Sequence, residues 1–178
     1  ALLEKIARAI HFAHEQGIIH RDIKPDNILV RNSDGEPQVS DFGLARDVQS
    51  DSKISITGQI LGTPSYMSPE QIEGFPDLID CRTDVFALGC VLYELLTGKM
   101  AHEGQGVMQI LDRVLDGIVI PPRTIRPQVP LDLQTICQKA MALEPDRRYQ
   151  TAEALAEDLA RFRRGEPLLA RPDGVLRR

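Results

Sequence analysis

The sequence predicts a mainly helical fold with one small β-hairpin, and three observations support that fold class. Apolar residues recur at three- and four-residue steps through much of the chain, a spacing that is typical of amphipathic helices. One segment is apolar on nearly every face, as expected of a helix buried inside a domain. With 178 residues, of which 42% are hydrophobic and 26% are charged, the chain is long enough to bury a core as one domain.

The first elements along the chain are predicted to be a helix and a hairpin. Apolar positions fall on one face of residues 1–16, so this segment is expected to be helical, and Gly17 is expected to end the helix. Short strands are expected at Ile28–Val30 and Gln38–Ser40, on either side of an Asp34-Gly35 turn.

The rest of the chain is predicted to be a long loop followed by further helices. Between Gly43 and Pro69 the sequence is polar, rich in Ser, Thr and Gly, and has little periodicity. Loops of that length are usually functional or disordered. The predicted helices are 83–96, which is apolar on nearly every face, and the amphipathic segments 106–115, 131–142 and 151–162, the last with Thr151 as a plausible N-cap.

Composition excludes several classes of protein. The net charge of −5 gives no reason to expect a nucleic-acid partner. The three cysteines are odd in number, widely spaced and without a Cys-x-x-Cys pair, which argues against a disulfide framework or a zinc site and fits a reducing compartment. The sequence contains no signal peptide and no apolar run long enough to span a membrane. These features together predict a cytoplasmic location.

Two polar motifs flank the predicted hairpin in the sequence. His20-Arg21-Asp22-Ile23-Lys24-Pro25-Asp26-Asn27 precedes the first strand, and Asp41-Phe42-Gly43 follows the second. A single surface Asp or Asn is nearly always structural, but carboxylate and amide oxygens are also the ligands that Mg²⁺ prefers. At this spacing the two motifs resemble the catalytic loop and the metal-binding motif of the eukaryotic-like bacterial serine/threonine protein kinases.

The resemblance implies the helical C-lobe of the α+β protein-kinase fold over residues 1–162. It also implies transfer of the γ-phosphate of Mg·ATP to Ser or Thr hydroxyls of a protein substrate, with ATP and Mg²⁺ as cofactors and Mn²⁺ as a substitute metal. Phosphoryl transfer depends on placement and charge neutralisation. By resemblance, Asp22 is the catalytic base and Lys24 contacts the transferring phosphoryl group. Asn27 holds one Mg²⁺, and Asp41 bridges the other Mg²⁺ to the phosphates of the nucleotide.

The resemblance extends to residues around the two motifs. The segment Gly62–Glu70 matches the family's segment ending in Ala-Pro-Glu, with Ser68 in place of alanine. By resemblance, Thr63 in this segment bonds the catalytic aspartate and lysine and helps to seat a Ser or Thr substrate. His20 is expected to pack beneath Phe42 and to take no part in acid–base chemistry.

Two buried charges are implied as structural supports. Glu70 is expected to form a buried ion pair with Arg148 that holds the lobe together, and Arg147 is the competing partner by position. Asp84, near the start of the 83–96 helix, is expected to hydrogen-bond the catalytic-loop backbone, to act as a simple N-cap, or to do both.

A phosphate-dependent switch is also implied. Kinases of this family with an arginine before the catalytic aspartate are commonly switched by a phosphate in the activation loop, which an arginine can grip with two hydrogen bonds. Arg21 takes that place here, with Thr57 as the first candidate acceptor and Ser55 as the second. The alternative is that these two hydroxyl residues are ordinary solvated loop residues.

Other parts of a working kinase are absent from the 178 residues, namely the glycine-rich loop, the β3 lysine and the αC glutamate. Because the lysine–glutamate pair must be in place for transfer, we expect a fragment that is inactive alone and lacks the N-lobe of its parent chain. The alternative is a non-catalytic, truncated interaction module. Arginines are frequent in residues 163–178, which suits a juxtamembrane segment on the cytoplasmic side of a membrane anchor and equally a plain disordered tail.

Overall fold

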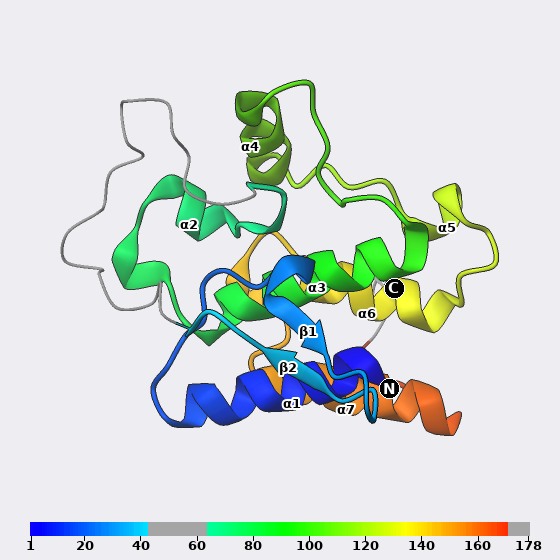
Figure 1. Cartoon of the computed structure of the whole chain (residues 1–178). Coiled ribbons are helices and arrows are strands. Elements are labelled where there is room, and N and C mark those ends of the chain that lie inside the picture. The colour runs from blue at the N-terminus through cyan, green and yellow to red at the C-terminus, as the bar shows by residue number, and fades with distance from the viewer. Residues whose placement is uncertain (43–63, 171–178) are drawn as a thin grey trace.

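The computed structural model describes residues 1–42 and 64–170, and within them the fold is mainly helical with one two-stranded sheet, as predicted (Figure 1). The longest helix, α3 (Cys81–Thr97), runs through the middle. α1 (Leu2–Glu15) and α7 (Ala152–Arg164) lie side by side and pack against it. α6 (Leu131–Ala140) contacts both α3 and α7, so these four helices enclose one hydrophobic core.

The central helix α3 is buried on nearly all sides, which confirms the prediction from its continuous apolar sequence. Every residue from Thr83 to Tyr93 is buried. Gly89 lets α6 come close, because a Cβ added there would lie 2.8 Å from the Cβ of Ala140 and 2.7 Å from the Cγ of Met141. A larger side chain at this position would force the two helices apart.

The two helices beside α3 show the amphipathic pattern that was predicted. α1 buries one face and is followed by Gly17, which adopts a left-handed conformation with φ of 74°. At the start of α7 the hydroxyl of Thr151 accepts a hydrogen bond from Ala154 N at 3.1 Å, so the predicted N-cap is present. The buried residues of α1 are Leu3, Ile6, Ala7, Ile10 and Ala13.

The hairpin lies on the surface next to α1. Strands β1 (Ile28–Val30) and β2 (Pro37–Val39) are antiparallel, and Ile28 pairs with Val39 while Val30 pairs with Pro37. The turn carries Gly35 with φ of 70°, a conformation that favours glycine. The second strand begins at Pro37, one residue before the predicted Gln38. A proline is tolerated at this position because an edge strand does not need every backbone N–H as a donor.

Several short helices in residues 1–42 and 64–170 were not predicted or fell inside predicted loops, and each of those named below begins with a proline. Proline suits the first helical position because its φ is already helical and its missing N–H needs no partner there. Segments this short are not marked by any hydrophobic period. They are η1 (Pro25–Asn27), η3 (Pro64–Tyr66), α2 (Pro69–Glu73), η4 (Pro76–Leu78), α5 (Pro122–Ile125) and η5 (Pro145–Arg147).

The chain folds back on itself after α7. Gly165, with φ of 72°, ends the helix, and the backbone N–H groups of Leu169 and Ala170 donate to the buried carboxylate of Asp158 at 2.7 and 2.9 Å. Residues up to 170 therefore pack on the domain. In residues 1–42 and 64–170, which include α4 (Val107–Leu115), no helix is long and apolar enough to cross a membrane.

Candidate active site

The loop before β1 brings three of the predicted site residues into contact. Lys24 Nζ donates to Asp22 Oδ2 at 2.8 Å. Asn27 Nδ2 donates to Asp22 O at 2.8 Å and to Asp22 Oδ2 at 3.1 Å. The short helix η1, which Pro25 starts, turns the chain so that Asn27 can reach back. The Asp22 carboxylate is therefore oriented by a cation and an amide from its own loop.

The second motif is tied to the first through the hairpin. Ser40 N donates to Asn27 O at 2.9 Å, so Asp41, the next residue, lies at the same end of the hairpin as Asn27. Asp41 is exposed and has φ of 63°, a strained left-handed conformation for a residue other than glycine. Ser40 Oγ donates to Asp41 Oδ2 at 3.1 Å. The two predicted metal ligands are thus brought to one end of the sheet.

The chemistry of these donors fits Mg²⁺. Because Asn27 uses its Nδ2 on Asp22, its amide oxygen faces away from that contact and receives no hydrogen bond from the described residues. Asp41 adds an exposed carboxylate. Residues 1–42 and 64–170 contain no group of three or more His, Cys, Asp or Glu side chains that could hold a metal ion. Mg²⁺ bound with nucleotide phosphates needs only one or two protein ligands, so two oxygens suffice.

His20 has a packing role in this site. Its ring lies 4.6 Å from the ring of Phe42, centroid to centroid, with the planes tilted by 59°. Its Nδ1 accepts from Asp22 N at 3.3 Å, and its Nε2 lies 2.9 Å from Ser40 O. A carbonyl oxygen only accepts, so the hydrogen-bond network assigns the ring proton to Nε2. Both ring nitrogens are therefore engaged in holding the loop.

Asp84 reaches from α3 to the catalytic-loop backbone. Its carboxylate is completely buried and accepts from His20 N and from Arg21 N, each at 2.8 Å. Arg21 needs this support because its φ of 67° is strained, at a cost of about 1–3 kcal/mol. The N-cap of α3 is Asp80, which accepts from Arg82 N. The simple N-cap alternative for Asp84 is therefore wrong.

His14 makes a contact with the site that was not predicted from the sequence. It lies on α1, and its Nε2 donates to Asp84 Oδ2 at 2.7 Å. With this contact, three donors surround one buried carboxylate, as a buried charge requires. No motif in the sequence marks His14, because its partner is far away along the chain.

Glu70 and Arg148 form a buried pair with two parallel hydrogen bonds. Arg148 Nη1 donates to Glu70 Oε1 at 2.7 Å and Nη2 donates to Oε2 at 2.9 Å. Thr83 Oγ1 donates to Oε1 at 2.8 Å. Burial acts to raise the pKa of Glu70, but the hydrogen bonds and charge of Arg148 outweigh it and lower that pKa below its ordinary value. The competing Arg147 is exposed and lies 3.7 Å from Glu144.

The remaining predicted residues concern phosphate control and substrate seating. Thr63, Thr57 and Ser55 lie outside the described residues. Arg21 is half-buried, and its Nε has no hydrogen-bond partner within the part of the chain that the structure describes.

Comparison with known proteins agrees with the motifs. The family model "Protein kinase domain" matches residues 1–160. The serine/threonine-protein kinase PknB of Mycobacterium leprae is 39% identical over 160 residues, and that of Mycobacterium tuberculosis is 40% identical over 161 residues; each match covers 90% of this chain and 25% of the relative. A probable serine/threonine-protein kinase of Clostridium acetobutylicum is 37% identical over 156 residues, or 88% of this chain and 23% of the relative. The chain thus spans about a quarter of the length of these curated relatives.

Proposed function

The chain belongs to the protein kinase domain family, as its motifs predicted, and on that premise we propose that it supplies the catalytic loop of a serine/threonine protein kinase. The parent protein would transfer the γ-phosphate of Mg·ATP to Ser or Thr hydroxyls of a protein substrate. Asp22 would accept the proton of the substrate hydroxyl, and Lys24 would neutralise charge on the transferring group. Asn27 and Asp41 would hold Mg²⁺, for which Mn²⁺ can substitute, and Mg²⁺ would neutralise charge on the phosphates.

One observation carries this proposal. Lys24 Nζ and Asn27 Nδ2 both donate to the same oxygen, Oδ2 of Asp22, at 2.8 and 3.1 Å. Oδ1 has no such partner among the described residues and is the oxygen left to accept a substrate proton. A general base must lie within hydrogen-bond reach of that proton, and the fixed orientation of the carboxylate supports the assignment.

The test is the Asp22→Asn variant of the intact parent kinase. Asparagine keeps the shape of the side chain but cannot accept the proton, so the transfer rate should fall by about 10²–10⁴-fold. Asp26→Asn is the matched control, because Asp26 is an exposed carboxylate in the same loop, and it should retain the rate. A transfer rate in Asp22→Asn close to that of the unsubstituted kinase would refute the assigned base.

We also propose that residues 1–178 do not transfer phosphate without the N-lobe of the parent chain. The glycine-rich loop, the β3 lysine and the αC glutamate, which grip ATP in this family, have no counterpart in the sequence. The second candidate function is therefore a non-catalytic interaction module. A titration of this chain with Mg·ATP separates the two. Binding at micromolar ATP would contradict the claim that the fragment is catalytically incomplete.

Phosphate control is a further part of the proposal. Arg21 would grip a phosphate on Thr57, or on Ser55, and the buried Nε of Arg21 without a described partner supports this assignment. Thr63 would help to seat the substrate hydroxyl. If Thr57→Ala and Ser55→Ala together leave the activity of the phosphorylated parent kinase unchanged, then these residues are ordinary loop residues.

The location of the parent protein is proposed to be the cytoplasm or the cytoplasmic face of a membrane. The arginines of residues 163–178 support the second arrangement if an anchor follows them. Residues up to 170 pack on the domain through Asp158, so an approach to the membrane would involve the last residues of the segment. Fractionation of cells that express the parent kinase distinguishes the two locations.

A further inference from the structure

Gln71, in the short helix α2, connects two parts of the site. Its Oε1 accepts from Ser68 N at 3.1 Å, which is one half of the capping box at the start of the helix, and it also accepts from Ser68 Oγ at 3.3 Å. Its Nε2 donates to Arg21 O at 2.8 Å. The first contacts stay within α2, but the last crosses to the catalytic loop.

The carbonyl that Gln71 binds belongs to the peptide unit that links Arg21 to Asp22. Arg21 has φ of 67°, and its own N–H is held by Asp84 at 2.8 Å. The strained residue is therefore held on both sides, by α3 through its N–H and by α2 through its carbonyl. Rotation of the Arg21–Asp22 peptide would move the Asp22 carboxylate, and Gln71 opposes that rotation.

We propose that Gln71 is a positioning residue that couples the placement of α2 to the orientation of Asp22. This inference rests on the proposed function. The candidate phosphate acceptors Thr57 and Ser55 precede α2 in the same segment of the sequence. A change in that segment that shifts α2 would therefore alter the orientation of Asp22 through the side-chain amide of Gln71.

The decisive variant is Gln71→Glu. A glutamate keeps an oxygen for Ser68 N and so keeps the capping box, but it has no donor for Arg21 O. In the parent kinase we expect kcat to fall by about 10-fold or more, because small misplacements of a catalytic group are costly, while KM for ATP stays within about 2-fold. Gln71→Ala should show the same fall in kcat. Ser68→Ala, which weakens the cap but leaves the bond to Arg21, is the control and should keep kcat.

A second readout does not depend on activity. In the 178-residue chain, the Asp22 amide should exchange with solvent about 10-fold faster in Gln71→Glu and at an unchanged rate in Ser68→Ala, because only the first loosens the peptide. If Gln71→Glu changes neither this exchange rate nor kcat, Gln71 is a helix cap and the proposal is wrong. If the exchange accelerates but the unsubstituted parent kinase transfers no phosphate, the proposed function fails and the structural coupling stands.

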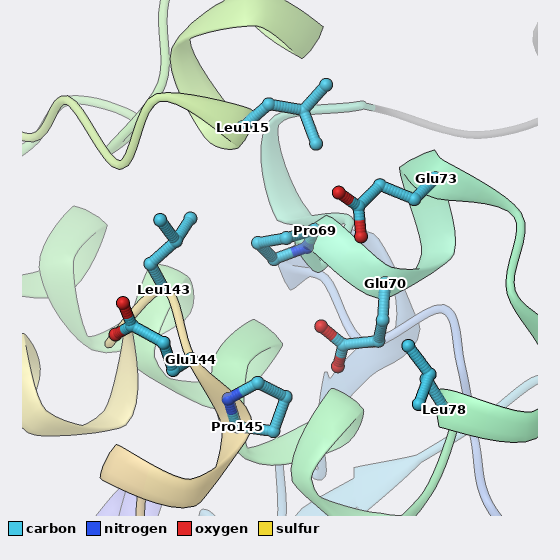
Figure 2. Close-up of a pocket in the computed structure, with 8 residues that line it drawn as sticks. All are labelled: Pro69, Glu70, Glu73, Leu78, Leu115, Leu143, Glu144 and Pro145. Atoms are coloured by element: carbon cyan, nitrogen blue, oxygen red, sulfur yellow. The ribbon is translucent and has the colours of Figure 1, made fainter.

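An independent feature is a pocket of about 240 Å³ beside α2 (Figure 2). Leu115 at the end of α4, Leu143 before η5 and Leu78 of η4 supply apolar walls. Leu78 is 53% exposed and Leu143 is 37% exposed, so both can be covered by a partner. Glu73 and Glu144 lie on opposite sides of the pocket.

The charges around this pocket are not equivalent. Glu70 lies in the wall of the pocket, but its carboxylate already accepts hydrogen bonds from Arg148 and Thr83. Glu73 has no ion-pair partner within the described residues, and Glu144 has only the exposed contact with Arg147 at 3.7 Å, a kind of pair that contributes little. Two carboxylates are therefore available to a cationic ligand.

We propose that this pocket docks a segment of the protein substrate in which an aliphatic side chain stands next to arginine or lysine. That the partner is a substrate rests on the proposed function, whereas the binding does not. Charge complementarity selects a basic segment. A second copy of this chain fits less well, because its net charge is −5 and a stable dimer buries about 800 Å² on each partner, far more than one side-chain pocket.

Binding can be measured with a short labelled peptide that has a central leucine flanked by arginines in an alanine and glycine background. Without Ser, Thr or Tyr it cannot act as a phosphate acceptor. The 178-residue chain should bind it, and Glu73→Lys with Glu144→Lys should weaken binding by about 10-fold. Glu103→Lys, an exposed carboxylate that does not line the pocket, is the matched control and should have a much smaller effect. Replacing the peptide's leucine by asparagine should also weaken binding.

Three results would overturn docking at this pocket. One is an unchanged affinity in the double variant, and another is an equal loss in Glu103→Lys, which would indicate only general charge attraction. The third is sedimentation showing that the unsubstituted chain pairs with itself through this face. If the peptide binds as expected but the parent kinase transfers no phosphate to any protein, the proposed function fails and the docking site remains.

Discussion

In the helical scaffold of α1, α3, α6 and α7, apolar side chains pack on one another, whereas the loop from His20 to Asn27 is held largely by hydrogen bonds. The scaffold has regular backbone angles, while Arg21 and Asp41 are the two residues other than glycine with positive φ among those described. Backbone strain is therefore concentrated where the chemistry is proposed. At Arg21 the strain is tolerated because Asp84, a buried residue of the scaffold, accepts from the Arg21 N–H.

The largest expected effect tests the scaffold. Arg148→Ala leaves Glu70 buried without its cation, and the free energy of unfolding should fall by about 3–5 kcal/mol. Urea denaturation of the 178-residue chain measures the change. Arg147→Ala is the matched control, since this neighbouring arginine is exposed, and it should change the free energy by less than about 0.5 kcal/mol. Equal and small effects in both variants would show that the buried pair does not hold the lobe together.

The next effect tests the connection between the two regions. The N–H groups of His20 and Arg21 donate to different oxygens of Asp84. In Asp84→Asn one of these oxygens is replaced by an NH₂ group, which cannot accept, so one of the two N–H groups loses its acceptor. We expect a loss of about 1–3 kcal/mol in the free energy of unfolding and faster proteolysis within the loop. Asp80→Asn, which changes the N-cap of the same helix, should leave proteolysis of the loop unchanged. If the loop is cut equally slowly in both variants, Asp84 is not what holds it.

A smaller effect is expected at the edge of the scaffold. Thr151→Ala removes the oxygen that accepts from Ala154 N, and this should cost about 1 kcal/mol of stability. Thr151→Ser keeps a hydroxyl in the same place and should cost only a few tenths. Thermal unfolding followed by circular dichroism compares the two. A serine variant as unstable as the alanine variant would mean that the methyl group matters more than the cap.

The smallest effect concerns pH. Arg148 lowers the pKa of Glu70 in the folded state despite burial, so the unfolded chain binds the proton more tightly. The ionised pair therefore contributes stability above the ordinary glutamate pKa of about 4.3, and that contribution is lost as the pH falls through the lowered pKa. The stability difference between the unsubstituted chain and Glu70→Gln should shrink as the pH falls below about 4. A difference that does not depend on pH would contradict this assignment.

Much of the fold was predictable because its signals are local. The amphipathic spacing of α1 and α7, the continuous apolar run of α3 and the Asp34-Gly35 turn each lie within one segment. The short helices α2 and α5 were missed because they are shorter than the window in which a period can be recognised. The second strand starts at Pro37, one residue before the predicted start, and a strand tolerates proline at such a position only at an edge or at its first residue.

The sequence by itself determined the family and the residues of the catalytic-loop motif. The structure added the contacts of Asp22 with Lys24 and Asn27, which are local because only a few residues separate these side chains and η1 turns the chain between them. The choice of Arg148 over Arg147, the buried contact of His14 with Asp84, and the bond from Gln71 to the Arg21 carbonyl were decided by the tertiary structure. The physical reason is that each of these contacts joins segments far apart in the chain. Which of two neighbouring side chains points inward depends on the packing of α2, α3 and η5 around it, and that packing has no local signature.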